Sequence, residues 1–507
     1  MRFHQLVLCL VVLVLFCGCG GGGGSTPSGS ASATDLGADP GAAPETEYVA
    51  FSAYDFVRES SYTVSASKVA EGSHCYVYLE RGQVVDQDAI ERVKSEYDAV
   101  IYPNLKDAFG DEPNPGVDGD SKIYILLLKI IDGFSAINKS YIAGYFDPVN
   151  EYDTPLSNKK EMIYLNMNPA PGIVVGDADF HDTLAHEFQH MIHWQQKTNL
   201  KNLLDDTWLD EAMSSVAGTY CGYGPSWYNV WIYEQDPSNS LVRWDSEAED
   251  YGVAYMWAQY FKDHYSGSGN IFKIMLNQNS TGISAVNAAL SAAGFGKSFA
   301  GTFRDLSIAV FSGNRTWPAN DEWSYTSIDT GPGVHDGYSL PGLFPSSTLG
   351  VTSLPVLGAY SMSFFHYSAT AAPVHSVTWT QAGANNYASF IRDDIPDVIY
   401  TMTSGTAYGY SAHGYLIEQQ LEGSSGGGTV VYSSVVRNAE KLADTEISTA
   451  LESRVPRSSR QILTEVNNSP VVNRFVAQKG KRFRVHMDSF FREREKELRK
   501  SGVRPSF

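Results

Sequence analysis

Residues 179 to 194 read DFHDTLAHEFQHMIHW, and this short stretch holds four of the twelve histidines of the chain. It contains the pattern His-Glu-x-x-His between His186 and His190, and a spacing of four residues on a helix brings both imidazoles to one face. Apolar residues at helical spacing, Leu184 among them, predict such a helix, with Asp179 as its N-terminal cap. Zinc suits this ligand pair, and a catalytic zinc site requires a third protein ligand and a water molecule.

The third ligand is expected on a following helix. Residues 206–217 read DTWLDEAMSSVA, which starts with a capping residue and continues with helix formers. Glu211 follows His190 at a distance that allows a turn and a returning helix. Its carboxylate would complete a set of two histidines and one glutamate whose fourth position holds water. A glutamate on a solvated helix face is the alternative.

These two segments carry a resemblance to a known family. The stretches HEFQHMIH at 186–193 and WLDEA at 208–212 are similar to the gluzincin class of zinc metallopeptidases, and most closely to the hyicolysin family. The resemblance covers about residues 48–340. It implies an α+β zincin-like fold with a mixed sheet and active-site helices, Zn²⁺ as cofactor, and a protein or peptide as substrate.

The resemblance also assigns roles to single residues. Glu187, beside a ligand on the same helix, is expected to take a proton from the attacking water and pass it to the leaving amine. By analogy with gluzincins, Tyr251 or Tyr255 on a later helix would stabilise the tetrahedral oxyanion, with His264 as a third choice. The alternative for both tyrosines is a packing role.

Two further positions concern the support of the metal ligands. His193 is a candidate for a contact behind these ligands, and an ordinary surface or core histidine is the alternative. Related proteins often carry an acidic residue soon after the ligand glutamate to orient a metal histidine. Ser215 stands at that position here, which predicts weaker support and lower metal affinity.

The N-terminus predicts export. Arg2 precedes an apolar run, residues 6–16, that is too short to cross a bilayer, since a spanning helix needs about 20 residues. It is typical of a signal peptide. The sequence LFCGC at 15–19 resembles a bacterial lipoprotein signal, which implies a lipid on Cys19 and attachment to a membrane of the cell envelope; ordinary secretion is the alternative. Residues 20–47 are Gly- and Ser-rich and predict a flexible linker after a signal segment of residues 1–19.

After the region that resembles a peptidase, the amino-acid composition and the pattern of apolar residues change. Residues 341–422 consist of short Val-, Tyr- and Thr-rich stretches broken by Gly, Ser and Pro, which predicts a smaller all-β domain. Residues 423–507 predict a linker and a polar, basic, partly disordered tail. One basic helix is expected over residues 488–500, with its charged side chains facing solvent; attraction to anionic lipid or to the acidic body of the chain is the alternative.

Three local patterns make further predictions. Residues 88–102 have apolar positions at helical spacing and predict a helix that stops before Pro103. Residues 161–166 predict a strand, either interior or at an exposed edge that pairs with an extended peptide. After removal of the signal, Cys75 and Cys221 form one disulfide or remain two buried thiols.

Composition limits the class of protein. The chain has 507 residues, of which 43% are hydrophobic and 19% charged, which predicts a globular protein of two to four folded units. A net charge of −20 opposes a phosphate-binding surface, so nucleic acid is not expected as a partner. The charge is uneven, because residues 451–507 hold 14 Lys or Arg against 6 Asp or Glu.

The leading hypothesis is an exported, lipid-anchored zinc endopeptidase. A zinc aminopeptidase is the nearest rival, but the acidic, Gly-rich strand motif that usually holds a free amine is not found upstream of His186. The rival from another class is a non-catalytic surface lipoprotein on a decayed peptidase fold. Retention of Glu187 opposes it, because a binding protein has no chemical use for a base beside two metal-type histidines.

Overall fold

A computed structural model describes most of the chain after its N-terminal segment. The described residues are 47–135, 140–167, 173–267, 269–314, 320–343, 350–353, 356–368, 375–381, 384–392, 399–402, 405–409, 413–423, 429–434, 483–484 and 488–505. Cys19 and nearly all of the expected signal and linker lie outside these residues, as does the tail between 435 and 482. The described residues from 47 onward belong to one compact unit.

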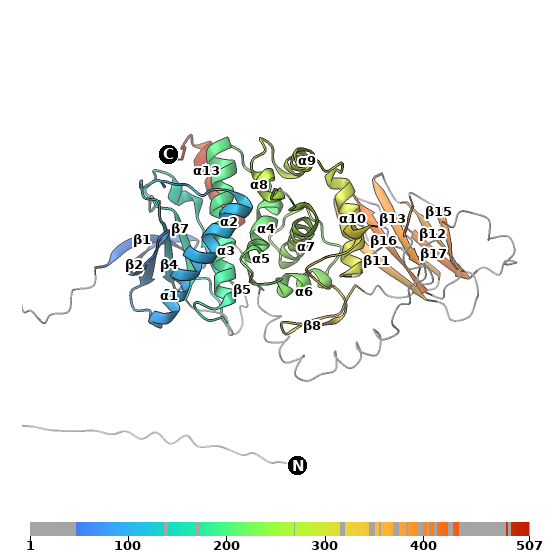
Figure 1. Cartoon of the computed structure of the whole chain (residues 1–507), viewed down its shortest axis with the longest axis horizontal. Coiled ribbons are helices and arrows are strands. Elements are labelled where there is room, and N and C mark those ends of the chain that lie inside the picture. Colours follow the sequence, from blue (N-terminus) through green and yellow to red (C-terminus); the bar gives the residue numbers. More distant parts are fainter. Residues whose placement is uncertain are drawn as a thin grey trace, which may run out of the picture. The chain divides into compact units, whose positions relative to one another are not determined.

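The N-terminal part of this unit contains a six-stranded mixed sheet (Figure 1). Neighbours within it are antiparallel except for the two pairs that β4 makes, with β3 and with β7, which are parallel. In spatial order its strands are β1 (Val49–Asp55), β2 (Ser60–Glu71), β3 (Cys75–Glu80), β4 (Ile123–Leu128), β7 (Met162–Asn166) and β6 (Gly144–Phe146).

Strand β4 shows why this sheet must be covered on both faces. Its sequence IYILLL is apolar throughout and every residue is buried, as expected for a central strand with parallel neighbours. Because side chains alternate between faces, Ile125 joins the core shared with the helices, whereas Leu126 joins a second core beneath the opposite face. The sheet therefore separates two apolar clusters, and each needs its own cover.

The helical cover includes a helix that the sequence pattern ended too early. Helix α1 (Gln87–Glu96) continues through a π-helical turn, η1 (Tyr97–Ile101), into α2 (Tyr102–Phe109). The predicted stop before Pro103 is wrong, because Pro103 falls in the first turn of α2, where a missing N–H costs least. The wider π turn provides the local adjustment that lets the helix continue.

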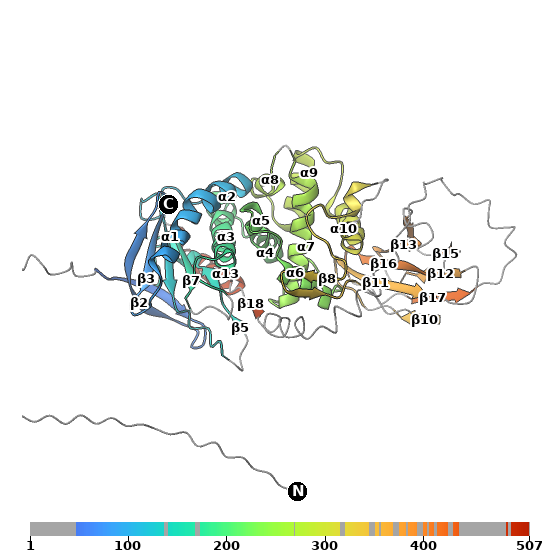
Figure 2. The ribbon, with the colours of Figure 1, turned by 60° about the horizontal axis from the view of Figure 1, so that its bottom comes forward.

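The cover of the opposite face comes from the C-terminus. Helix α13 (Asp488–Lys500) has the predicted bounds, and Glu497 and Lys500 are exposed, but Phe491 and Glu495 are buried, so the prediction of a solvated helix is wrong for that face. Phe491 is fully buried in the second core, where its ring stacks on Tyr145 with centroids 4.9 Å apart. Figures 1 and 2 show α13, at the red end of the colour bar, beside elements from the first half of the chain.

Most of the middle of the chain is helical, and these helices carry the candidate site. Helix α3 packs against α4 and α5, and α4 packs against α7. The helices are α3 (Ala178–His193), which continues into the π-helical η3 (Trp194–Asn199), α4 (Thr207–Ser215), α5 (Ala217–Tyr220), α6 (Trp227–Gln235), α7 (Ala248–Tyr265), α8 (Ile271–Leu276), α9 (Gly282–Ala292) and α10 (Phe299–Ser312).

Shorter elements complete this part of the chain. They are two 3₁₀ turns, one small hairpin and one parallel pair that joins the tail to a loop. Their bounds are η2 (Pro148–Glu151), η4 (Asp321–Trp323), β8 (Gly333–His335) with β9 (Tyr338–Leu340), and β5 (Ser140–Tyr141) with β18 (Phe483–Arg484).

A separate all-β region follows α10. It consists of two four-stranded antiparallel sheets, and the first includes β17 beyond residue 422, where we expected the region to end. One sheet has the order β10 (Gly350–Ser353), β17 (Thr429–Ser434), β12 (His375–Thr380) and β15 (Gly405–Gly409); the other has the order β11 (Ser361–Ser368), β16 (His413–Gln420), β13 (Asn386–Arg392) and β14 (Ile399–Met402). Gln419 of β16 donates a hydrogen bond of 2.6 Å to Ser307 of α10.

Two of the open alternatives are decided by the fold. Strand β7 lies between β4 and β6, so it is interior and is not an exposed edge that captures peptide. Cys75 and Cys221 are both free and buried, and burial raises the pKa of each thiol well above its ordinary value. In the part of the chain described, no helix combines the length and the apolar character needed to cross a membrane.

Candidate metal centre

Helix α3 carries its polar residues into the interior. It begins at Ala178, and its cap is Asp177, whose carboxylate accepts from the backbone N–H of Phe180; the predicted cap, Asp179, lies within the first turn. From Thr183 to its end every residue of α3 is buried. Buried polar groups require hydrogen-bond or ionic partners, and several of these partners lie on α4.

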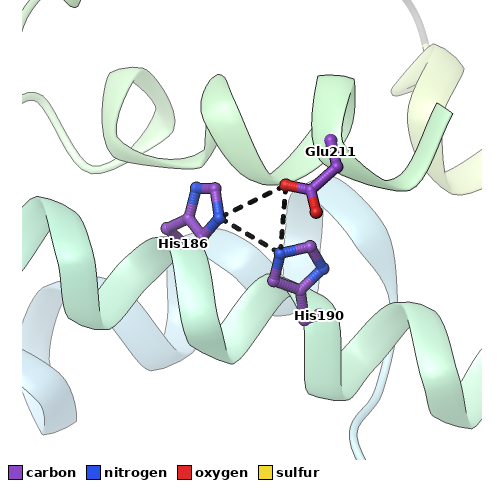
Figure 3. A group of neighbouring side chains, drawn as sticks. All are labelled: His186, His190 and Glu211. Carbon is purple, nitrogen blue, oxygen red and sulfur yellow. Dashed lines mark hydrogen bonds and ion pairs between the residues drawn. The ribbon is translucent and has the colours of Figure 1, made fainter. Parts of the chain in front are cut away.

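Three predicted ligands meet between α3 and α4 (Figure 3). The Nε2 atoms of His186 and His190 lie 3.1 Å apart. One carboxylate oxygen of Glu211 lies 3.7 Å from the first of these nitrogens and 3.6 Å from the second. All three side chains are buried, and Figure 3 shows both rings and the carboxylate facing one common point. The alternative of a solvated Glu211 is therefore wrong.

The donor set fits a zinc ion. Zinc–nitrogen bonds of about 2.0 to 2.1 Å at tetrahedral angles place two ligand atoms about 3.3 Å apart. The three observed separations lie close to that value, and two nitrogens with one carboxylate oxygen are ligands that zinc accepts. The arrangement leaves room in the ligand set for water as a fourth member.

His190 is oriented by the residue directly before the third ligand. Its Nδ1 atom lies 3.1 Å from one carboxylate oxygen of Asp210. A carboxylate accepts at this position, so we assign the imidazole proton to Nδ1, which leaves the lone pair of Nε2 directed toward His186 and Glu211. Carboxylate–histidine pairs of this kind fix the ring of a metal ligand and raise its basicity.

Asp210 corrects the expectation drawn from Ser215. The hydroxyl of Ser215 donates to the backbone carbonyl of Ala212 at 2.9 Å, and the carboxylate that contacts the predicted ligand His190 belongs to Asp210 instead. Sequence reasoning missed Asp210, although its carboxylate stands next to the predicted ligand in the segment WLDEA. The predicted weakness of the support behind the ligands does not follow from a serine at position 215.

His193 lies in the same polar group. Its Nδ1 atom is 2.8 Å from the Asp210 carboxylate, and its Nε2 atom is 3.3 Å from the carboxylate of Asp205. Burial lowers the pKa of His193 to about 4, against the opposing effect of Asp205, so the ring is neutral at physiological pH. The predicted contact behind the metal ligands therefore runs through Asp210.

The two candidate tyrosines have different surroundings. Tyr251 and His186 line the same small polar pocket, where the tyrosine ring packs against Trp244 with centroids 4.8 Å apart. Tyr255 is fully buried, and its hydroxyl accepts a 2.9 Å hydrogen bond from the backbone N–H of Ser226. The packing alternative thus describes Tyr255, and Tyr251 remains the candidate oxyanion donor.

His264 is engaged elsewhere. Its Nε2 atom lies 2.7 Å from the backbone carbonyl oxygen of Ser324, and its ring packs on Tyr260 with centroids 4.7 Å apart. These contacts hold the ring against the segment after α10. His264 is not among the residues that line the pocket beside His186.

The pocket, which has a mostly polar lining, lies beside the three candidate metal ligands. Side chains and backbone from α3, α4, α6 and α7 contribute to it, and it opens beside a predicted ligand. Its lining consists of Asp182, His186, Ser214, Ser215, Ser226, Tyr228, Asn229, Ala248 and Tyr251. Glu187, the expected base, is fully buried and follows His186 directly on α3.

Comparison with known proteins bears on this geometry. No family model matches the chain. Over 231 residues the chain is 31% identical to the neutral metalloprotease ShpI of Staphylococcus hyicus. The predicted resemblance to a metallopeptidase is confirmed. The aligned part is 43% of this chain and 52% of the relative, so the chain spans about half the length of that metalloprotease.

Proposed function

We propose that this chain is a zinc metallopeptidase of the gluzincin type, with a zincin-like catalytic region, that hydrolyses peptide bonds. The observation that carries the proposal is the buried convergence of His186, His190 and Glu211 from two neighbouring helices. Burying two imidazoles and a carboxylate this close together costs free energy, and a bound cation offsets that cost. The similarity to a metalloprotease supports the same reaction class.

The residues around the cluster suit peptide hydrolysis. A zinc ion held by His186, His190 and Glu211 would polarise a carbonyl group and lower the pKa of a coordinated water toward 7. Glu187 takes the proton of the attacking water and delivers it to the leaving amine. The phenol of Tyr251 donates a hydrogen bond to the developing oxyanion, which stabilises charge that is absent from the ground state. Asp210 keeps His190 in the ligand orientation.

Turnover by the whole chain and by its Glu187→Gln variant tests the mechanism. Glutamine keeps the shape of the side chain but accepts no proton, so zinc content should stay the same while hydrolysis of casein and of labelled peptides falls by about 100-fold or more. Glu249→Gln makes the same change in α7 at a residue outside the pocket lining, and it should keep full activity. Equal turnover in the Glu187→Gln and wild-type proteins, both with zinc bound, would refute the assignment.

Internal cleavage is the proposed mode of action. Support for it comes from the sequence, in which the acidic, Gly-rich motif that holds a free amine is not found upstream of the histidine pair. Matched peptides with free and acetylated N-termini separate the alternatives. An endopeptidase cuts both at the same internal bonds, whereas an aminopeptidase releases single residues from the free peptide alone.

Export and lipid anchoring belong to the same proposal. The apolar run 6–16 and the sequence LFCGC at 15–19 support a lipid on Cys19 and a location at the bacterial cell envelope. Labelling with a radioactive fatty acid should mark the wild-type protein and Cys17→Ala, but not Cys19→Ala. Label in Cys19→Ala would place the lipid on another residue. An unlabelled wild-type protein released into the medium would favour ordinary secretion.

A further inference from the structure

The carboxylate of Asp210 joins three side chains from different parts of the fold. One of its oxygens lies 3.1 Å from Nδ1 of His190 and 2.8 Å from Nδ1 of His193. The other oxygen forms an ion pair with the guanidinium group of Arg492 on α13. The side chain of Asp210 is 6% exposed and that of Arg492 is 16% exposed, so the pair is largely shielded from water.

Arg492 reaches this position on a firmly held helix. The carboxylate of Glu495 accepts hydrogen bonds from the hydroxyl of Tyr152 at 2.6 Å and from the indole N–H of Trp194 at 2.9 Å. Arg494 pairs with Asp147 at 2.9 Å. Phe491, buried in the second core, anchors the same turn. Side chains placed by several independent contacts of this kind keep a fixed geometry.

The guanidinium group also contacts the loop before α4. One of its amino groups donates to the backbone carbonyl of Asp205 at 3.2 Å. Arg492 therefore holds both the start of the segment that carries the third ligand and the carboxylate that orients the second ligand. His190, His193, Asp205, Asp210, Arg492 and Glu495 line one small cavity behind the metal cluster.

The charge of Arg492 and its position both affect the orientation of the Asp210 carboxylate at the candidate metal centre. A buried carboxylate is stable as an anion only when a cation or several donors compensate it. With Arg492 on one oxygen, the plane of the Asp210 carboxylate is fixed, and the other oxygen is directed at the ring of His190. Loss of that contact would leave this oxygen without its cationic partner, and the carboxylate would be held through the oxygen that faces His190 and His193.

We propose that Arg492 is a positioning residue of the metal centre, which acts through Asp210 to hold His190 in its ligand orientation. The C-terminal helix then completes a site whose ligands all lie far earlier in the chain. This inference rests on the proposed function only in requiring that His186, His190 and Glu211 bind zinc. It does not depend on the substrate or on the place of cleavage.

Zinc affinity of the metal-free whole chain is the direct test. We would measure it by competition with a chromophoric chelator, which needs no turnover. Loss of a partner behind a ligand costs about 10- to 100-fold in metal affinity, so Arg492→Gln, one contact further out, should lose about 10-fold. Arg492→Lys keeps the charge but loses the planar fork, and it should recover part of the loss. Lys500→Gln removes the same charge from the same helix and should bind zinc as the wild type does.

A second variant separates positioning from docking of the helix. Arg494→Gln removes the ion pair with Asp147 and so weakens docking, but it leaves Arg492 and its contact with Asp210 in place. It should lower the free energy of unfolding while zinc affinity stays within about twofold. Equal loss of zinc affinity in Arg494→Gln and Arg492→Gln would overturn the proposal, as would unchanged affinity in Arg492→Gln.

The outcome is distinguishable from failure of the proposed function. If the wild type binds zinc tightly without hydrolysing any peptide, the peptidase assignment fails, and the comparison of zinc affinities still decides the role of Arg492. In an active enzyme, Arg492→Gln should lower kcat with little change in KM at subsaturating zinc, because fewer molecules carry the metal. A rise in KM with constant kcat would contradict the proposal.

Discussion

Replacement of Asp210 by asparagine perturbs the metal centre without removing a ligand. Asparagine has nearly the size of aspartate, and its amide oxygen still accepts a hydrogen bond from Nδ1 of His190. The substitution removes the negative charge. In the wild-type protein this charge lies 3.1 Å from that ring nitrogen and also pairs with Arg492. Two separate effects are expected, one on zinc affinity and one on the stability of the metal-free fold.

The two magnitudes follow from the contacts. Outer partners of metal histidines are worth about 10- to 100-fold in affinity. Because asparagine keeps the acceptor, we expect a loss of about 30-fold, which corresponds to about 2 kcal/mol. Arg492, mostly shielded, loses its carboxylate but keeps the carbonyl of Asp205. Breaking a buried pair costs about 3–5 kcal/mol, so the free energy of unfolding should fall by about 3 kcal/mol.

Chelator competition and urea unfolding of the metal-free protein measure the two effects separately. Asp236→Asn, the same change at the exposed end of α6, is the matched control and should alter neither quantity by much. In the double variant Asp210→Asn/Arg492→Gln, stability should partly recover because no buried charge is left unpaired. Its zinc affinity should equal that of Asp210→Asn, since Arg492 acts through the missing carboxylate. Zinc affinity of Asp210→Asn within twofold of the wild type would refute the reasoning.

Four further substitutions extend the tests. Glu211→Gln removes a ligand charge and should lower zinc affinity by more than the roughly 100-fold upper limit for an outer partner, measured by the same competition; a smaller loss would place the third ligand elsewhere. Tyr251→Phe should lower kcat about 100-fold at constant KM, whereas Tyr255→Phe should mainly lower stability by about 1–3 kcal/mol; equal kinetic effects would contradict the distinction drawn from their contacts. Glu151 is fully buried, and its pKa is raised well above 4.5 by burial and by the neighbouring carboxylate of Glu161. Because the folded pKa is raised, the stability that protonation provides is complete below pH 4.5 and is lost as pH rises toward the higher value. Glu151→Gln should remove this loss, so its advantage in melting temperature over the wild type should grow from pH 5 to pH 9; parallel curves would count against it.

The sequence identified those parts of the site that depend on local geometry. His186, Glu187 and His190 lie within one turn of α3, so the regular spacing of a helix was enough to place both imidazoles together. Glu211 required a longer step, from the capping residue and helix formers of residues 206–217 to a second helix that returns to the first, and the resemblance to known metallopeptidases agrees with it. The structure brings the side chains of these three candidate ligands, His186, His190 and Glu211, together as predicted.

Residues whose role depends on distant partners escaped prediction. Tyr255 and Tyr251 share one helix, and nothing in their spacing indicates that one hydroxyl is taken by Ser226 while the other ring lines a pocket beside His186. In the sequence, nothing distinguishes Asp210 from any other aspartate on a helix. Only the fold shows that its carboxylate contacts His190. In both cases the deciding contact joins two helices, between residues 20 positions apart for His190 and Asp210 and 29 apart for Ser226 and Tyr255.

The fold, like the site, could be predicted only in part. The resemblance to known metallopeptidases implies a mixed sheet with helices around the candidate site, and short Val-, Tyr- and Thr-rich stretches broken by turn residues predict a separate all-β region. Pro103 misled the pattern because a π turn, which has no reliable sequence signal, lets the helix continue past it. The interior position of β7 depends on pairing with β6, a strand of three residues that is too short to show alternation.

Helix α13 shows most clearly why charge is ambiguous in a sequence. Its sequence, DSFFREREKELRK, has few apolar residues, and a pattern of that kind usually marks a solvated surface. In the fold its charges meet partners that other segments supply, since Arg492 pairs with Asp210, Arg494 with Asp147, and Glu495 accepts from Tyr152 and Trp194. Paired charges can be buried whereas isolated ones cannot, and a sequence does not reveal which of the two it holds. The basic surplus after residue 451, set against the acidic remainder of the chain, was the available signal that this helix has a docking surface within its own protein.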